Sequence, residues 1–216
     1  MILVIGNKNY SSWSMRPWLV MRQFEVGFDE LRLSLDSPGF AADIAAYSGA
    51  GKVPVLVHQG RSVWDSLAIC EYVAELHPSA SMWPSDNVAR AQARSVSAEM
   101  HSGFSSLRRQ LPMNCRATGR RVELEESTRA AIQRIERIWT QCLTSASHEK
   151  PYLFGKFSIA DAMYAPVVSR FSTYGIELGE VARDYMAAIV DLPAYRDWVR
   201  EAIAETELLP QEEIGL

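Results

Sequence analysis

The sequence predicts an α/β domain followed by an all-helical domain. Strand-like and helix-like segments alternate over residues 1–77, residues 78–86 form a turn-rich connector, and no strand-like pattern follows in residues 87–216. A chain of 216 residues is long enough for two small domains. We therefore expect one domain at 1–77 and a second at 87–216, with 78–86 as the linker.

The first elements of the α/β domain follow from apolar runs and capping residues. Met1–Ile5 is a continuous apolar run, typical of a buried strand. A helix is expected after the polar loop that follows, with Ser14 as its N-cap and Pro17 in its first turn, where the missing N–H costs little. The alternating leucines of residues 28–35 predict a second strand.

The rest of this domain completes the order βαβαββα. A right-handed crossover would make the first two strands parallel, and the turn at Gly60 would make the last two an antiparallel hairpin, so that helices cover both sides of one sheet. The expected elements are a helix at 41–47, strands at 51–57 and 62–64, and a helix that opens at Asp65-Ser66 and ends before Pro78.

The second domain is predicted from apolar residues at helical spacing. From Ala89 to Leu111 they recur every three or four positions, which indicates one long amphipathic helix ended by Pro112. Further helices are expected around 132–142, from Ser158 through the largely apolar stretch to Phe171, at 180–190 and at 194–205.

Charge and cysteine content exclude several classes of function. The net charge of −4 provides no basic field for a nucleic acid, and no apolar stretch approaches the roughly 20 residues of a membrane helix. The first residues lack the basic start of a secretory signal. The chain has no CxxC pair among Cys70, Cys115 and Cys142, so we expect neither a metal site nor a dithiol motif. The odd number of cysteines suggests a reducing environment, and we expect a cytoplasmic protein.

Three short segments carry the candidate chemistry. In Tyr10–Arg16, serines stand at a helix N-terminus, where free N–H groups stabilise an anion, although one serine as a plain N-cap is the alternative. In Lys52-Val53-Pro54 the X-Pro bond is ordinarily trans, and a cis bond would instead present the Val53 backbone to an extended peptide. Asp65-Ser66 is either a simple cap or a site for a zwitterion, with Asp65 on the ammonium and the helix end on the carboxylate.

Together these segments resemble the cytosolic glutathione transferases over nearly the whole chain. Val53-Pro54 matches the cis-proline motif of the family's thioredoxin-like domain, and Asp65-Ser66 matches its acidic-or-glutamine–serine motif. Phe157–Ala162 matches the capping box and hydrophobic staple of the family's helical domain. Ser11–Arg16 is similar to the serine motif of the zeta class, with a tryptophan where that class has cysteine, and Glu99–Phe104 resembles a broad bacterial group.

The resemblance implies an enzyme that activates the thiol of glutathione as co-substrate. Making a thiol of pKa about 8.5 mostly thiolate at pH 7 requires lowering its pKa by roughly two units, or about 3 kcal/mol, which a hydroxyl donor and a helix N-terminus could supply together. Ser11 aligns with the family's catalytic serine, Ser12 is a close second as the hydrogen-bond donor, and Tyr10 is a third. The affinity for an anionic tripeptide must come from local helix ends, serines and Lys52, because the whole chain is acidic.

The resemblance also assigns the remaining contacts of glutathione. Val53, with Pro54 fixing the turn, would bind the cysteinyl backbone, and Asp65 and Ser66 would hold the γ-glutamyl end. Lys52 would approach the glycyl carboxylate, with a solvated surface lysine as the equal alternative.

A small hydrophobic electrophile is expected to bind between the two domains. The candidate residues are Trp13, Phe104, Leu107 and Arg108, although Phe104 and Leu107 also fit the apolar core stripe. His101 lies off that stripe and is expected to be a surface or network residue.

Four activities remain open at this stage. The first is glutathione transfer by thiolate attack on an electrophilic carbon, in a homodimer as the family implies. The second is a glutathione-dependent isomerase like the zeta class, which the paired serines favour and Trp13 disfavours. A thiol transferase or dehalogenase is the third, and a non-catalytic binding or partner-recruiting protein on the same fold is the fourth.

Overall fold

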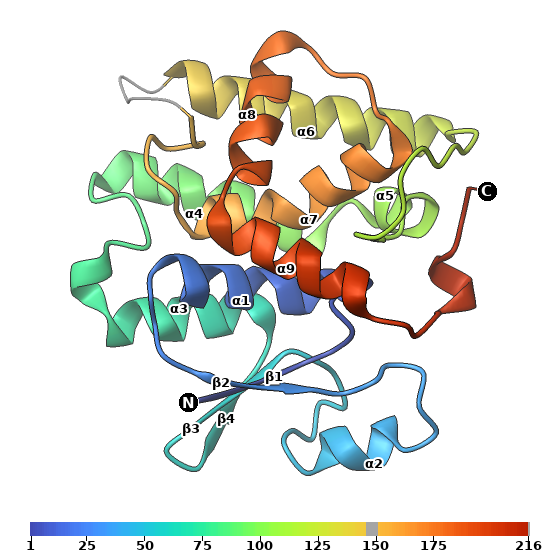
Figure 1. Cartoon of the computed structure of the whole chain (residues 1–216). Coiled ribbons are helices and arrows are strands. Elements are labelled where there is room, and N and C mark those ends of the chain that lie inside the picture. The colour runs from blue at the N-terminus through green and yellow to red at the C-terminus, as the bar shows by residue number, and fades with distance from the viewer. Residues whose placement is uncertain (146–150, 216) are drawn as a thin grey trace.

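The computed structural model describes residues 1–145 and 151–215, and its N-terminal part is built on one four-stranded mixed sheet (Figure 1). The strands are β1 (Ile2–Ile5), β2 (Asp29–Arg32), β3 (Val55–His58) and β4 (Arg61–Val63), in the order β2-β1-β3-β4. β1 and β2 are parallel, and β3 and β4 form an antiparallel hairpin, as predicted. This is the thioredoxin-like arrangement that the resemblance implied.

Helices cover both faces of the sheet because its central strands are apolar on both sides. On one face, Leu3 of β1 and Leu56 of β3 are paired and pack into the main core, which α1 (Ser12–Gln23) and α3 (Ser66–Leu76) share. On the other face, Val4 and Val55 pack against Ile44 of α2 (Phe40–Ala45). The alternation of side chains along a strand thus places two cores back to back.

The start of α1 differs from the prediction. Ser11, not Ser14, is the N-cap, because the Ser14 hydroxyl accepts a hydrogen bond from the Gly6 N–H at 3.1 Å and lies inside the helix. Pro17 is consequently an interior residue of α1 rather than a first-turn residue. The earlier start brings Ser12 into the first helical position, next to the free N–H groups of the helix end.

The C-terminal part is all-helical in the described residues, as predicted. Its helices are α4 (Asn87–Ser102), α5 (Ser105–Gln110), α6 (Glu126–Ser145), α7 (Ile159–Tyr174), α8 (Glu180–Val190) and α9 (Pro193–Ala204), with short 3-10 turns at Pro78–Ala80 and Pro210–Glu212. Nearly every residue of α7 is buried, and this helix packs against α1, α4 and α8. α7 therefore packs against the sheet-bearing part through α1 and against the helical part through α4 and α8 (Figure 1).

The expected single helix over 89–111 is wrong, since the chain breaks between α4 and α5. Phe104 has a left-handed φ of 61°, and a side chain at Gly103 would bring a Cβ to 2.8 Å from the Glu99 carbonyl oxygen. Only glycine fits that close approach. The spacing of apolar residues continues unchanged across the break, so it gave no sign of it in the sequence. After the break, α5 packs against α6.

The start of α7 has the predicted capping box. Asp161 Oδ2 accepts hydrogen bonds from the Ser158 N–H at 2.9 Å and from the Ser158 hydroxyl at 3.0 Å, and Asp161 Oδ1 accepts one from the Leu153 N–H at 3.0 Å. Burial raises the pKa of Asp161 to about 6, although these hydrogen bonds act in the opposite direction.

None of the described helices combines the length and apolar character needed to cross a lipid bilayer.

Candidate functional site

The N-terminus of α1 holds the two candidate serines in different ways. The Ser11 hydroxyl donates to Ser14 Oγ at 2.7 Å and accepts from the Ser14 N–H at 3.4 Å. The Ser12 hydroxyl accepts from Arg170 Nη2 at 3.4 Å, and its own proton has no acceptor among the described residues. Ser12 therefore has the free donor, whereas the Ser11 proton is already used for capping.

Tyr10, the third candidate, is engaged elsewhere. Its hydroxyl donates to Glu213 Oε1 at 2.6 Å and accepts from Arg116 Nη2 at 2.8 Å. Burial, and then the hydrogen bond to Glu213, raise the pKa of Tyr10. A phenol held in this way is not positioned to donate to a thiolate.

Trp13 lies between two guanidinium groups. The Arg16 and Arg108 guanidinium carbons lie 4.4 Å and 4.6 Å from the indole ring centroid, and the His101 ring meets it edge-on at 5.2 Å. These are cation–π distances. Of the four expected pocket residues, Trp13 and Arg108 are thus brought together.

Three arginines, Arg16, Arg108 and Arg170, form what we call the arginine cluster. Arg16 has no exposed surface, and none of its guanidinium nitrogens has a hydrogen-bond partner in the described structure. Arg108 Nη1 and Arg170 Nε also lack partners there. No described carboxylate lies within salt-bridge distance of the cluster, and Glu212 acts on Arg170 only from longer range.

The electrostatics of the cluster reflect its burial. Desolvation, and then the like charge of Arg108, lower the pKa of Arg170 to about 10, and the same two causes lower the pKa of Arg16 well below its ordinary value. Guanidinium groups nevertheless stay charged in proteins at neutral pH. Buried positive charge without a counter-charge is costly, so the cluster is stabilised by any anion that reaches it.

The Val53-Pro54 peptide bond is cis, which is the functional alternative that the sequence left open. It directly precedes β3, the strand that pairs with β1. Lys52 is exposed, so its head group is in solvent.

The Asp65-Ser66 motif starts α3 and is joined to the serine motif by one histidine. Asp65 Oδ1 caps α3 by accepting from the N–H groups of residues 67 and 68 at 3.1 and 3.3 Å, and its Oδ2 lies 2.9 Å from His101 Nε2. Ser66 is fully buried, and its hydroxyl has no partner among the described residues. Because His101 also packs against Trp13, the N-termini of α1 and α3 meet at α4.

The other two expected pocket residues lie at the break between α4 and α5. Phe104 precedes α5 and is partly buried against the main core. Leu107 has no exposed surface and belongs to that core, the alternative that its place on the apolar stripe had kept open.

Sequence reasoning gave no role to Arg16 and Arg170, and none beyond a network to His101. A usable signal existed for Arg170, because it is the one charged residue of α7 beyond the first turn, in a largely apolar helix. Arg16 follows Ser12 by one helical turn, which places both on one face of α1. No comparable pattern marks His101.

The chain's own cysteines are not reactive thiolates, and its described residues form no metal-binding group. Burial raises the pKa of Cys115 and of Cys142 to about 11, so both are thiols at neutral pH. Burial raises the pKa of Cys70 as well. No group of three or more metal-ligating side chains occurs in residues 1–145 and 151–215.

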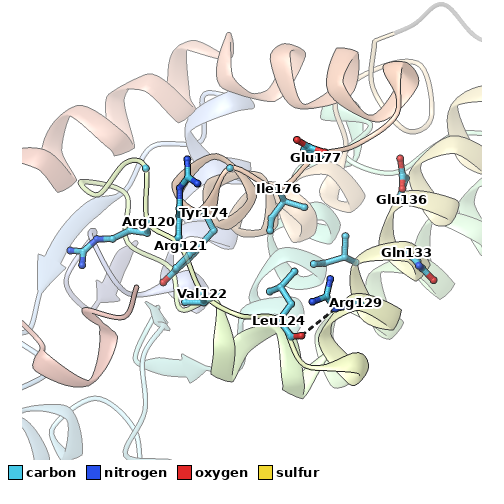
Figure 2. Close-up of a pocket in the computed structure, with 13 residues that line it drawn as sticks. Arg120, Arg121, Val122, Leu124, Arg129, Gln133, Glu136, Tyr174, Ile176 and Glu177 are labelled. Carbon is cyan, nitrogen blue, oxygen red and sulfur yellow. Dashed lines mark hydrogen bonds between the residues drawn. The ribbon is translucent and has the colours of Figure 1, made fainter. Parts of the chain in front are cut away.

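A separate pocket of about 750 Å³ lies on the helical part, and Figure 2 shows its lining. It is bordered by the 119–124 segment, the first half of α6 and the turn after α7. Tyr174 and Ile176 form part of the wall, while the Arg120 side chain points away from the other labelled side chains. None of the serines, Asp65 or the arginine cluster lines this pocket.

Two family models match most of the chain. The model described as "Glutathione S-transferase, N-terminal domain" matches residues 10–76, and the model described as "Glutathione S-transferase, C-terminal domain" matches residues 91–201. Among curated proteins, a probable maleylacetoacetate isomerase of Caenorhabditis elegans is 33% identical over 96 residues, a stretch that spans 44% of this chain and 44% of that relative.

Solved structures share the fold along nearly the full length. A glutathione transferase homologue from Burkholderia GL BGR1 with bound glutathione has a TM-score of 0.73 at 22% identity, over 94% of this chain and 98% of that one. A maleyl pyruvate isomerase, described as a bacterial zeta-class glutathione transferase, has a TM-score of 0.74 at 19% identity, over 96% of this chain and 100% of that one. At such identities the likeness concerns the fold.

Proposed function

Since the chain belongs to the glutathione S-transferase family, we propose that it binds glutathione and adds the glutathione thiolate to a small electrophile that carries a carboxylate. The observation that carries this proposal is the arginine cluster, in which Arg16 and Arg170 are buried and Arg108 is half-buried; it lacks carboxylate partners in the described structure and touches Ser12 through Arg170. The cluster favours anionic groups beside the serine that has a free proton.

Glutathione is proposed to lie along the three motifs. The Val53 backbone pairs with the cysteinyl residue at the cis Val53-Pro54 bond. The γ-glutamyl end meets the N-terminus of α3, where Ser66 has an unused hydroxyl and Asp65 faces the ammonium. Lys52 lies at the entrance as a solvated contact for the glycyl carboxylate.

Ser12 is proposed as the donor to the thiolate. The proton of the Ser12 hydroxyl has no acceptor in the described structure, and the residue stands at the first position of α1. The Arg170 guanidinium donates to the Ser12 oxygen and places a positive charge beside it. The helix end and the hydrogen bond both favour the thiolate over the thiol. Ser11, which aligns with the family's catalytic serine, is proposed to hold the helix end in place.

The substrate class follows from a count of charges. The arginine cluster contributes three positive charges, while one thiolate contributes a single negative charge and Glu212 acts only from longer range. A second anionic group therefore lowers the electrostatic energy of the complex. This changes the expected substrate from a purely hydrophobic electrophile to one that bears a carboxylate near Arg108 and Trp13.

A glutathione-dependent isomerase is the second candidate. Its support is the 33% identity to the probable maleylacetoacetate isomerase over 96 residues. In that reaction the thiolate adds to a cis double bond, the carbon–carbon bond rotates, and the thiolate leaves again, so glutathione is regenerated. Turnover of maleylacetoacetate with glutathione at one hundredth of the substrate concentration would select the isomerase over the transferase.

The test of the main proposal is a pair of electrophiles matched in mechanism. 1-Chloro-2,4-dinitrobenzene is neutral, whereas 4-chloro-3-nitrobenzoate carries a carboxylate, and both lose chloride to a thiolate. Arg108→Gln should lower kcat/KM for the benzoate by about tenfold, the value of one charge-assisted hydrogen bond, and change the neutral substrate by less than about threefold. The matched control is Arg109→Gln, an exposed neighbour that pairs with Glu125.

The proposal fails if wild-type protein does not bind glutathione in calorimetry, which would leave a non-catalytic protein. Equal losses with both electrophiles would instead return the substrate class to neutral compounds. We also propose a homodimer in the cytoplasm, as the resemblance implies, and light scattering coupled to size exclusion measures the dimer mass.

A further inference from the structure

The loop that leads into Ser11 and Ser12 is held by a segment some 200 positions later in the chain. We call residues 6–11 the serine loop and residues 198–213 the C-terminal segment; both lie at the right of Figure 1, where β1 runs into α1 and the chain leaves α9. Their contacts involve main chain and side chains, and they come from several residues. This arrangement makes the geometry of the serines dependent on the far end of the sequence.

Glu205 binds the backbone of the serine loop. Its Oε1 accepts from the Lys8 N–H at 2.7 Å and its Oε2 accepts from the Asn9 N–H at 3.0 Å, while the carboxylate is only 8% exposed. Trp198 Nε1 donates to the Lys8 carbonyl oxygen at 3.0 Å. The N–H and the carbonyl oxygen of Lys8 are thus both held by the C-terminal segment, and the bonds to Glu205 are charge-assisted.

The Lys8 side chain is also enclosed. Its ammonium pairs with Glu30 at 2.7 Å and with Glu201, and it lies 4.9 Å and 5.5 Å from the ring centroids of Trp18 and Trp198. A buried ammonium with two carboxylates and two indoles has little freedom to move.

Glu213 binds the other end of the serine loop. Its Oε1 accepts from the Tyr10 hydroxyl at 2.6 Å and from Asn114 Nδ2 at 2.9 Å, and its Oε2 pairs with Arg120. Tyr10 directly precedes Ser11. The two carboxylates therefore hold three consecutive residues, Lys8 and Asn9 by their backbone and Tyr10 by its hydroxyl, directly before Ser11.

We propose that Glu205 and Glu213 are positioning residues for the thiol-activating serines. Neither carboxylate contacts Ser11, Ser12 or the arginine cluster by a hydrogen bond in the described structure. They act through the serine loop, which sets where α1 begins and so where the Ser12 hydroxyl stands relative to Arg170. The inference rests on the proposed function for its kinetic consequence.

The first test compares Glu205→Gln and Glu213→Gln with the wild type. A glutamine has one acceptor oxygen where the carboxylate uses two, with little change in volume. Glu205→Gln therefore loses one of the two hydrogen bonds to the loop backbone, and Glu213→Gln cannot accept from both Tyr10 and Arg120 and loses the negative charge that strengthens the Tyr10 bond. We expect kcat to fall by about tenfold to a hundredfold, because small misplacements of a reacting group cost this much, while KM for glutathione changes by less than about threefold. The ultraviolet absorbance of bound thiolate should titrate at higher pH in both variants.

The matched control is Glu207→Gln. Glu207 lies two positions from Glu205 on the same segment, but its carboxylate pairs with Arg32 at 2.7 Å and makes no described contact with the serine loop. Its kcat and thiolate titration should stay at wild-type values. If the Glu205 and Glu213 variants match this control, the positioning role is overturned.

The second measurement does not need glutathione. Hydrogen–deuterium exchange of peptides from residues 6–16 should be faster in both variants, with unchanged exchange in α6. Faster exchange throughout the chain, in step with the loss of kcat, would show a general loss of stability and would overturn the inference. If wild-type protein binds no glutathione, the proposed function fails, and the exchange result alone decides: acceleration confined to residues 6–16 supports the positioning role, and its absence overturns it.

Discussion

The N-termini of α1 and α7 each have a serine as N-cap, but the polar groups around the two caps are paired to different extents. At α7, Ser158 and Asp161 bind each other and the Leu153 N–H, so the described polar groups are paired. At α1, Ser11 is paired by Ser14, but Ser12 keeps a free proton and the nearby Arg16 has no hydrogen-bond partner in the described structure.

This difference separates residues that build the fold from residues that serve a ligand. A closed set of hydrogen bonds stabilises the folded chain by itself, whereas buried donors without acceptors lower stability until an anion binds. The comparison predicts that substitutions in the capping box of α7 change the free energy of unfolding and leave catalysis intact, while substitution of Ser12 at α1 does the reverse. Each prediction below tests this comparison at one of the two helix ends or at the glutathione contacts.

The largest effect is expected for Asp161→Ala. The change leaves the Leu153 and Ser158 N–H groups buried without acceptors, which costs about 3–5 kcal/mol. For a chain of this size Tm should fall by about 6–20 °C. Differential scanning fluorimetry measures the shift, and kcat per folded molecule should stay at the wild-type value. A loss of kcat without a loss of Tm would reverse the assignment of the two helix ends.

The pH dependence of stability should isolate the same carboxyl. Burial raises its folded pKa to about 6 from 3.8, so the folded state binds more protons than the unfolded state between these values. Its contribution is therefore present below about pH 4 and is lost as pH rises through about 6, a change of roughly 3 kcal/mol. Urea unfolding between pH 4 and 8 measures the free energy of unfolding of wild type and of Asp161→Asn, and the difference between them should narrow with rising pH. A difference that stays constant with pH would contradict the raised pKa.

At α1, Ser12→Ala should lower kcat by about a hundredfold, the cost of removing one donor to a developing or bound anion. Tm should change by less than about 2 °C, because the hydroxyl pairs only with Arg170. Steady-state assays with glutathione and 4-chloro-3-nitrobenzoate measure the rate.

Ser11→Ala is the matched variant and should show the opposite balance. Removing the N-cap costs about 1 kcal/mol and lowers Tm by about 2–4 °C, with a smaller loss of kcat than at Ser12. A larger kcat loss at Ser11 than at Ser12 would restore the assignment that the family alignment favours.

The smallest effect is expected for Lys52→Ala. The lysine is exposed, so its attraction for the glycyl carboxylate is screened by water and salt. Calorimetry should show glutathione affinity weakened by less than about threefold. A tenfold loss would contradict the solvated contact and would indicate a close ion pair between Lys52 and the glycyl carboxylate.

Much of the fold could be predicted because its signals are local. The order of strands and helices, the hairpin at Gly60 and the capping box at Ser158 each depend on residues close together in sequence. The break at Gly103 was missed because the apolar spacing runs unchanged across it. The choice of Ser11 over Ser14 as the cap depends on the Gly6 N–H, which occupies the Ser14 hydroxyl.

The candidate site was predictable only in the parts that motifs mark. Ser12, Val53-Pro54 and Asp65-Ser66 are visible as motifs at helix and strand starts. The arginine cluster draws Arg16, Arg108 and Arg170 from three helices, and only the packing of α1 against α7 brings Arg170 to Ser12. Charge that converges from distant positions leaves no local pattern.

The hold of Glu213 on Tyr10 has a consequence for biosynthesis. The two residues are 203 positions apart, so the segment that carries the serines leaves the ribosome long before its last partner is made. At about 5–20 residues per second, this interval is roughly 10 to 40 s. During that time the nascent sheet-bearing part lacks the carboxylates that fix its serine loop. We therefore expect ribosome-bound chains arrested before residue 205 to carry an unformed thiol-activating centre.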